Sequence, residues 1–461
     1  MTACARPQSG LAAGIAAAAA GAAPQLWLVA SGHPDGRAAF DSVVYHERFI
    51  RELIRDFPHF DFSNPLTATT PGYHLLMACI GTVVSQSPTV LRLASVAVCA
   101  GFIGTFAAWC ARRRGTVEGV LLALPLACST YVLGSGAWLL PDDLAWLLLT
   151  LTVTLALRGV AGTRAMAAAG ALLAALVFVR QSAAWAAATV WLSAWAGSGS
   201  ERDPLPAPGA LRRLGMAAVA TVPAAAVLVW FVAIWGGLAP PRFRPDVAGV
   251  NPATPAIVLV QAAIVGIAFL PWLWDGIRAR LSDSGPLLAG AGLLGVVAAV
   301  VPETFPSSME SGRWSGWWGP IGALPSVGGR TSVAVLLLAP LGATLLASAL
   351  LSVPARARLV LFGGTLAFVA AVSSTFNSWQ RYHEPWILVL LAMLSCLQEG
   401  RAAPRPVAKA LAAGALCALL GAIAWRGLGQ PKVAPDEPVP EYHLAPEGGL
   451  PPWRRTEAPV P

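Results

Sequence analysis

The chain has 461 residues, of which 56% are hydrophobic and only 12% are charged. Soluble domains carry about 25% charged residues, so this composition excludes an ordinary soluble domain. The apolar runs approach the roughly 20 residues that cross a bilayer and do not alternate with polar residues, which predicts a helical multi-span membrane protein and disfavours a β-barrel. The net charge of +8 resides in short arginine clusters between apolar runs, which indicates cytoplasmic loops and not nucleic-acid binding.

An all-α chain with about thirteen membrane spans is predicted. The first apolar run, 11–30, is longer than the core of a signal peptide, and no small-residue cleavage site leads from it into a soluble domain. We therefore expect this run to remain as the first span. The other spans are expected at about 90–110, 117–137, 143–157, 165–179, 183–196, 212–236, 255–274, 285–301, 333–352, 359–375, 385–398 and 409–424.

The connections between these spans predict an orientation. With the N-terminus inside, every second connection is short, rich in arginine and cytoplasmic, as the positive-inside rule requires. These connections are 111–115, 158–164, 199–213, 277–283, 354–358 and 398–409.

A shorter apolar run at 71–84 does not fit the pattern of spans. Its roughly 14 residues are too few to cross a bilayer, and counting it as a span would move the arginines of 111–115 outside. We therefore expect an interfacial or re-entrant helix on the outer side. Pro71 suits its first turn, and Thr70 is the expected cap.

The chain divides into a membrane module, 1–425, and a tail, 426–461. The module includes a long first outer loop, 31–89. The tail holds nine prolines in 36 residues and has little apolar pattern. We therefore expect it to lie on the outer side of the membrane and to be disordered or loosely attached.

The first outer loop carries the carboxylates that could take part in chemistry. Apolar residues recur three and four positions apart from 45 to 57, which predicts an amphipathic interfacial helix. Glu47 on this helix belongs either to a solvated face or, with Asp61, to an acceptor-binding surface. Asp41 precedes the helix and is either its N-cap or a general base that removes a proton from a substrate hydroxyl.

Basic side chains at two later span ends are candidates for binding a phosphate. Arg180 and Gln181 interrupt two short apolar runs, where a charge is costly unless it has a partner. A lipid phosphate is a suitable partner, because a guanidinium binds phosphate through two parallel hydrogen bonds. Arg381 and His383 stand at the outer start of another span, where the alternative is an aromatic belt with snorkelling charges.

A tryptophan cluster at 312–320 has two interpretations. Trp314 and Trp317 either anchor the chain at the membrane interface or form an aromatic platform for a sugar ring. The histidines show no standard metal-ligand spacing, so no metal site is predicted, although a divalent cation is left open as a cofactor. The histidines concerned are His33, His46, His59 and His74.

Several of these motifs together resemble the GT-C superfamily of multi-span glycosyltransferases, which use polyprenyl-phosphate sugars. Within it, the chain is most similar to the α-1,2-glucosyltransferases that use dolichyl-phosphate glucose in N-glycan precursor assembly. The segments that carry the resemblance are "FDSVVYH" (40–46), "NPLTATTPG" (64–72), "PDDLAWLLLTL" (141–151), "FVRQSAAW" (178–185) and "QRYHEP" (380–385). The chain departs from the glucosyltransferase pattern where Ser42 replaces Glu, Asn64 replaces Asp and Ser182 replaces Thr.

The resemblance implies an inverting enzyme of the plasma (inner) membrane that is active on the extracytoplasmic side. It would move a sugar from a polyprenyl-phosphate donor to a hydroxyl of a glycan, lipid or protein acceptor, in contact with membrane lipids and not with nucleic acid. Asp41 would act alone as general base, and the donor phosphate would be held by Arg180, Gln181, Arg381 and His383. The alternatives are a lipid or sugar transporter or flippase, which the nearly charge-free span centres disfavour, and a non-catalytic assembly factor.

Overall fold

Helices make up 77% of this computed structural model, and there is almost no strand, which confirms the prediction of an all-α chain. In the part of the chain that the structure describes, the short strands β1 (Ser326–Val327) and β2 (Thr331–Ser332) form an antiparallel pair. The described residues are 7–32, 39–160, 162–197, 205–305, 307–314, 316–398, 405–428, 434 and 436–444.

Seven of the described helices are long and apolar enough to cross a membrane. They are α1 (Pro7–Ser31), α4 (Pro88–Arg114), α10 (Ala210–Trp235), α12 (Thr254–Asp283), α15 (Val333–Leu351), α16 (Ala355–Ser373) and α18 (Pro406–Leu428). The number rises to eight if α5 (Thr116–Cys128) and α6 (Thr130–Ala137), which are bent by 71° relative to each other, form one span. These helices support a multi-pass membrane protein, whereas the total of thirteen spans stays a prediction.

The other predicted spans coincide with shorter helices. They are α7 (Asp142–Arg158), α8 (Thr163–Val179), α9 (Ala187–Ala196), α13 (Gly285–Val300) and α17 (Glu384–Leu397). The span expected at 183–196 is not one regular α-helix. Its first residues belong to the 3₁₀ turn η4 (Gln181–Ala186), and α9 follows directly. The helix is therefore interrupted at Arg180, where the sequence places a charge between two apolar runs.

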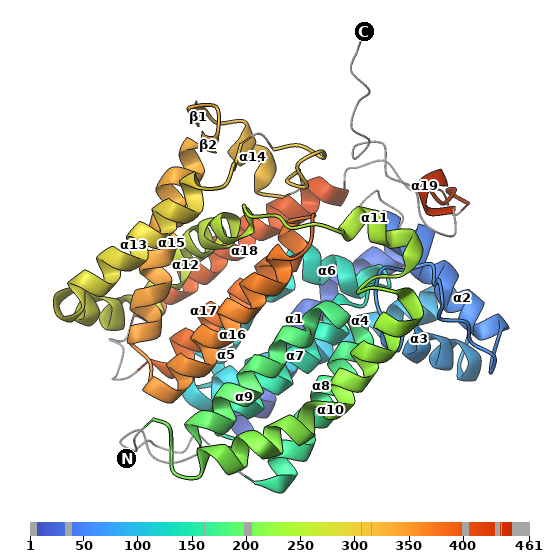
Figure 1. Ribbon diagram of the computed structural model, residues 1–461, viewed down its shortest axis with the longest axis horizontal. Coiled ribbons are helices and arrows are strands. Elements are labelled where there is room, and N and C mark those ends of the chain that lie inside the picture. Colours follow the sequence, from blue (N-terminus) through green and yellow to red (C-terminus); the bar gives the residue numbers. More distant parts are fainter. Residues whose placement is uncertain are drawn as a thin grey trace.

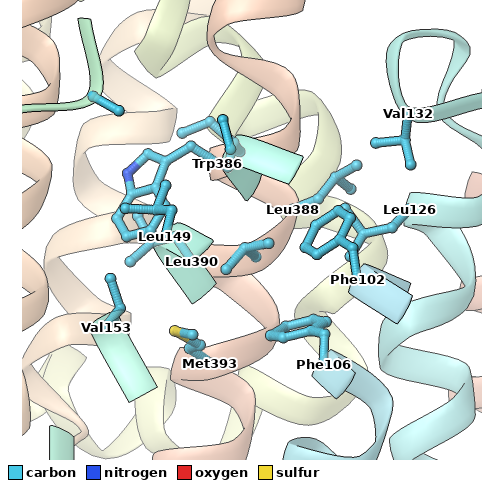
Figure 2. Packing of buried hydrophobic residues seen from close by; sticks show 14 of the residues in the cluster. Phe102, Phe106, Leu126, Val132, Leu149, Val153, Trp386, Leu388, Leu390 and Met393 are labelled. Atoms are coloured by element: carbon cyan, nitrogen blue, oxygen red, sulfur yellow. The ribbon is translucent and has the colours of Figure 1, made fainter. Parts of the chain in front are cut away.

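Helix α17 lies in the middle of the bundle (Figure 1). It is apolar on all sides, and every residue from Glu384 to Cys396 is buried, as expected of a helix that other helices surround. Figure 2 shows its side chains between those of α4, α5 and α7, with Leu388 directed toward Phe102 and Leu126. The main hydrophobic core therefore forms around α17, and its first residues stand next to the candidate site.

Small residues allow close contact between helices, as is common in membrane proteins. A Cβ added at Gly342 of α15 would lie 1.9 Å from the carbonyl oxygen of Leu259 on α12. A Cβ added at Gly14 of α1 would lie 3.0 Å from the carbonyl oxygen of Gly104 on α4. Glycine is therefore required for the observed approach of the α12–α15 pair.

Charged side chains join helix ends at one end of the bundle, which we call the basic end. Lys409 at the start of α18 contacts Glu118 at the start of α5 at 2.7 Å, and Arg405 contacts Asp275 of α12 at 2.7 Å. Arg114, the last residue of α4, donates a hydrogen bond to a backbone carbonyl near the end of α17. The opposite end, called the site end, holds the starts of α7 and α17 and the end of α8.

The first loop forms helices near the positions that the sequence predicts. The π-helical turn η3 (Ser42–His46) leads into α2 (Glu47–Arg55), which buries Phe49, Ile50 and Leu53 on its apolar face. The short apolar run forms α3 (Gly72–Val83), which packs beside α2 at the edge of the bundle (Figure 1). Both helices that were expected in this loop are therefore present.

Thr70 does not cap α3 as expected. Pro71 occupies the N-cap position, and no side chain makes a capping hydrogen bond there. The Thr70 hydroxyl instead donates to the carbonyl oxygen of Val177 on α8, at 2.8 Å. Because a fixed proline ring already shapes this helix start, the hydroxyl is free to join the loop to the bundle.

A described part of the tail contacts the bundle, and the expectation of a disordered or loosely attached tail stays a prediction. Helix α19 (Glu441–Leu444) places His443 against η5 (Pro241–Phe243) and α11 (Arg244–Val247). Its Nδ1 lies 2.9 Å from the hydroxyl of Tyr45, and its Nε2 lies 2.5 Å from Asp246. Arg48 also donates a hydrogen bond to the backbone carbonyl of Glu437, so the segment has polar partners that its composition did not reveal. Residues 429–433, 435 and 445–461 lie outside the described part.

Candidate functional site

A cavity of about 510 Å³ lies at the site end of the bundle. Its walls come from α7, the junction of α8 and η4, the segment after α10, α16 and η6 (Gln380–Tyr382). Apolar side chains that line it include Trp146, Leu149, Trp185, Leu228 and Phe368. Charged side chains that line it are Asp142, Arg180, Arg244 and Arg381. An apolar wall with a few convergent polar groups is the usual composition of a small-molecule site.

Two ion pairs stand at this cavity. Arg381 pairs with Asp41 of the first loop, and Arg180 pairs with Asp142 at the start of α7. All four side chains are partly shielded, with between 14% and 31% of their surface exposed. The fold therefore brings together Asp41, Arg180 and Arg381, which are far apart in the sequence and were selected from it as site residues.

Both arginines converge on one aromatic ring. The guanidinium carbon of Arg180 lies 5.3 Å from the ring centre of Tyr382, and that of Arg381 lies 5.2 Å from it. Arg381 also lies 4.3 Å from the ring centre of Trp379. Such cation–π contacts hold the arginines beside the cavity while leaving their N–H donors for other partners. The buried Nε of Arg381 makes no hydrogen bond within the described residues.

Asp41 is positioned by its ion pair and not by capping the helix. It occupies the N-cap position of η3, but its side chain makes no capping hydrogen bond. Burial raises the pKa of Asp41, whereas the charge of Arg381 and its hydrogen bond lower that pKa by more, so the carboxyl stays below its ordinary value. Asp41 is therefore ionised at neutral pH. It does not line the cavity itself but reaches it through Arg381.

The π-helical turn after Asp41 ends at His46, which contacts His74 of α3. π-helical turns often occur at functional sites. His46 Nδ1 lies 2.7 Å from His74 Nε2, and the two rings are stacked within 8° of parallel. Burial lowers the pKa of His46 to about 4, despite the opposing charges of Asp41 and Asp142, so the ring is neutral at neutral pH. No residue of this pair was proposed from the sequence as part of the site.

Gln181 lines the cavity, but its amide group is used by the backbone. Its Oε1 accepts from the amide of Thr70 at 3.1 Å, and its Nε2 donates to the carbonyls of Ala68 and Leu238 at 2.8 and 3.0 Å. Gln181 therefore joins the first loop, η4 and the segment after α10. In this arrangement it positions the site and has no free donor for the phosphate that the sequence assigned to it.

His383 does not reach the cavity. It is fully buried, its Nδ1 lies 3.5 Å from Gln261 Nε2, and its ring packs edge-on against Phe368, which forms the cavity wall. Burial lowers the pKa of His383 to about 3, so the ring carries no charge at neutral pH. A buried, neutral ring that does not line the cavity does not fit the expected role in holding a phosphate. The sequence could not show this, because side chains at the start of a helix can point either toward a surface or into the core.

The carboxylates predicted to bind the acceptor also lie away from the cavity lining. Glu47 forms ion pairs with Arg51 at 2.8 Å and with Arg92 at 3.7 Å. Asp61 is exposed and accepts a hydrogen bond from the amide of Ser63 at 2.8 Å, which is a local turn. With 15% of its side chain exposed, Glu47 belongs to a partly shielded ion-pair network and not to a solvated face, and its role in acceptor binding stays a prediction.

The tryptophan cluster contacts the site through Trp379. Trp314 is 39% exposed, and its ring meets that of Trp379 edge-on with 5.9 Å between the centres. Trp379 in turn stacks on Tyr382 at 5.6 Å. The backbone amide of Trp317 donates to Gln380 Oε1 at 2.6 Å, which fastens the cluster to η6. Trp314 thus presents an exposed aromatic surface next to the arginines, whereas Trp317 supports it.

Several residues of the site were not selected from the sequence. Asp142 was seen only as part of the outer turn "PDD", although a carboxylate at a span end is a signal for a buried charge pair. Arg244 and Tyr382 had no distinguishing spacing. Within the described residues, no group of three or more His, Cys, Asp or Glu is placed to hold a metal ion. His33 lies outside the described part.

No protein-family model matches the chain, and no curated protein matches it in sequence. The site is therefore interpreted from its own residues.

Proposed function

We propose that the chain is an integral-membrane glycosyltransferase of the GT-C type that takes its sugar from a polyprenyl-phosphate donor. The reaction transfers the sugar to an acceptor hydroxyl with inversion. Asp41 is the general base, and Arg180 and Arg381 hold the donor phosphate. Gln181 is a positioning residue in this proposal, and His383 is left out of it.

The observation that carries the proposal is that Arg180 and Arg381 line the same cavity and converge on Tyr382, while most of the other lining residues are apolar. A lipid-linked phosphate combines the matching features, because its anionic group lies next to a hydrocarbon chain. Guanidinium groups bind phosphate oxygens in pairs of charge-assisted hydrogen bonds. The cavity lining of Trp146, Leu149 and Leu228 offers the hydrocarbon its apolar surface.

The residues can perform the transfer in one displacement. The acceptor oxygen forms a bond to the anomeric carbon of the sugar while the bond between that carbon and the phosphate oxygen breaks. The acceptor proton passes to the carboxylate of Asp41, and the phosphate leaves with the bonding electrons. Arg180 and Arg381 then stabilise the additional negative charge on the phosphate, which is the charge that develops in the transition state.

The acceptor side of the site is proposed at the exposed ring of Trp314. Trp314 contacts Trp379, and Trp379 contacts both Tyr382 and Arg381 at the cavity. These rings connect the proposed acceptor surface with the arginines. The acceptor is a glycan, lipid or protein hydroxyl, and no nucleic acid is involved. We place the protein in the plasma (inner) membrane with the site end outside, because the basic end carries the arginine-rich connections.

The proposal is tested with purified protein in detergent and a panel of radiolabelled polyprenyl-phosphate sugars. The wild type is expected to consume at least one donor, and Asp41→Asn is expected to abolish consumption while keeping the melting temperature of the wild type. Asp275→Asn, which changes an ion pair at the basic end, is the matched control and should retain activity. Full activity of Asp41→Asn would remove this residue from the mechanism.

A further inference from the structure

The phosphate-binding donors of the site are already occupied in the structure. Arg180 is paired with Asp142, and Arg381 is paired with Asp41. The two pairs give the cluster no net charge, although it contains both arginines that the proposed function assigns to the donor. A donor phosphate can therefore reach these guanidinium groups only in competition with the two carboxylates.

The geometry explains why the pairs form. Both guanidinium groups lie within 5.3 Å of the ring centre of Tyr382, so two like charges are held near the same ring. Neighbouring positive charges repel each other unless an anion lies beside them, and this repulsion grows as the site loses water. Asp142 lines the cavity together with both arginines. Its carboxylate thus occupies the part of the cavity in which a phosphate would sit.

The pairs are also accessible enough to be exchanged. Between 14% and 31% of each side chain is exposed, so neither pair is sealed in the core. Ion pairs that water reaches contribute little net stability, so a competing anion can displace one partner. A phosphate with several acceptor oxygens can satisfy both guanidinium groups at once, whereas each carboxylate here satisfies one.

We propose that Asp142 is an internal counter-anion, which occupies Arg180 while the cavity is empty and is exchanged for the phosphate of a lipid monophosphate when that ligand binds. This inference rests on the proposed function, because it concerns the same phosphate site. No residue of the sequence-based site had this role. The ligand class is a single phosphate esterified to a hydrocarbon chain, which is a diester in the sugar donor and a monoester in the lipid phosphate that remains after transfer and in the farnesyl phosphate probe.

If the phosphate also replaces Asp41 as the partner of Arg381, this exchange sets the order of donor binding and proton transfer. In the empty site, Arg381 holds Asp41, and the paired carboxylate is a weak proton acceptor. When the phosphate takes over the hydrogen bonds of Arg381, Asp41 loses its partner and becomes a stronger base. The base is thereby activated only when a donor is present, which places donor binding before deprotonation of the acceptor.

The test measures equilibrium binding of tritiated farnesyl phosphate to the full chain in nanodiscs, with empty nanodiscs as the blank. Because Asp142→Asn removes the competing charge, we expect its Kd to fall about 3- to 10-fold below that of the wild type. Arg180→Gln should raise Kd by about 10-fold or more. Asp275→Asn, which changes the more exposed pair with Arg405 at the basic end, should leave Kd unchanged.

The Asp142→Asn change in the Arg180→Gln background separates exchange from simple repulsion. If Asp142 competes for Arg180, the change gives no gain once the arginine is absent. An equal gain in both backgrounds would mean that Asp142 only repels the phosphate, and it would overturn the inference. So would an unchanged or raised Kd of Asp142→Asn in the wild-type background.

These outcomes are distinguishable from a failure of the proposed function. If Arg180→Gln weakens binding but Asp142→Asn does not strengthen it, the phosphate site stands and the counter-anion does not. If farnesyl phosphate does not bind the wild type, or binds equally after Arg180→Gln, both proposals fail. Asp41→Asn is the second variant in case Asp142→Asn does not fold, and its Kd is also expected to fall.

Discussion

Acidification is expected to destabilise the protein through His46. The ring is 9% exposed and stacked on His74. Burial lowers its pKa to about 4, whereas in the unfolded chain the group has its ordinary value of 6.5. At pH values between about 4 and 6.5, His46 is therefore protonated in the unfolded chain but not in the folded protein. The free energy of unfolding therefore falls as the pH decreases from about 6.5 to about 4, and it is constant above that window.

The magnitude follows from the two pKa values of His46. One pKa unit corresponds to 1.36 kcal/mol, so the full difference amounts to about 3 kcal/mol. That is a substantial part of the stability of an ordinary domain, which is about 5–15 kcal/mol. More than half of this loss falls above about pH 5, where carboxylates with an ordinary pKa are still mostly ionised, so acidification should lower the melting temperature clearly.

The assay is the melting temperature of the purified protein in detergent as a function of pH, for the wild type and His46→Asn. The variant should be less stable at neutral pH, because it loses its contact with His74, but its melting temperature should depend less on pH. His59→Asn is the matched control, because His59 is exposed on the same loop. An identical pH dependence in the wild type and His46→Asn would refute the reasoning.

Three other predictions follow from single contacts. Gly342→Ala should destabilise the protein by about 1–3 kcal/mol, because its Cβ would overlap a carbonyl of α12. Gly421→Ala on α18, where a Cβ meets open space, should not destabilise the protein, and the melting temperatures of the two variants test the difference. Gln181→Leu removes its backbone hydrogen bonds and should cost about 1–3 kcal/mol, and an unchanged melting temperature would contradict the positioning role. Arg381→Gln removes the charge that lowers the pKa of Asp41, so the acidic limb of the transfer activity should move to higher pH, as a pH–rate profile will show.

The helical class of the protein could be predicted because it depends on composition and on the length of apolar runs. The same patterns located α2 and α3, since their apolar residues recur at helical spacing. The composition of the tail did not predict the contacts of His443 with Tyr45 and Asp246. Attachment of this kind depends on which surface lies opposite, and the local sequence does not contain that information.

The site could be predicted in part, and the reason differs from residue to residue. Arg180 was selected because a charge between two apolar runs requires a partner, and Asp41 was selected because it precedes the amphipathic helix of the first loop. His383 was misplaced, because a helix start presents several directions and the sequence does not say which one faces a cavity. Asp142 was overlooked, since its partner is 38 positions away and the pairing exists only in the folded chain.

The most direct measurement is a cryo-EM map of the protein in nanodiscs with bound farnesyl phosphate. The account predicts phosphate density in the cavity, within hydrogen-bond distance of both Arg180 and Arg381, with the carboxylate of Asp142 turned away from Arg180. Phosphate density at the basic end, near Arg405 and Lys409, or an unchanged pair of Arg180 and Asp142 beside an empty cavity would contradict it.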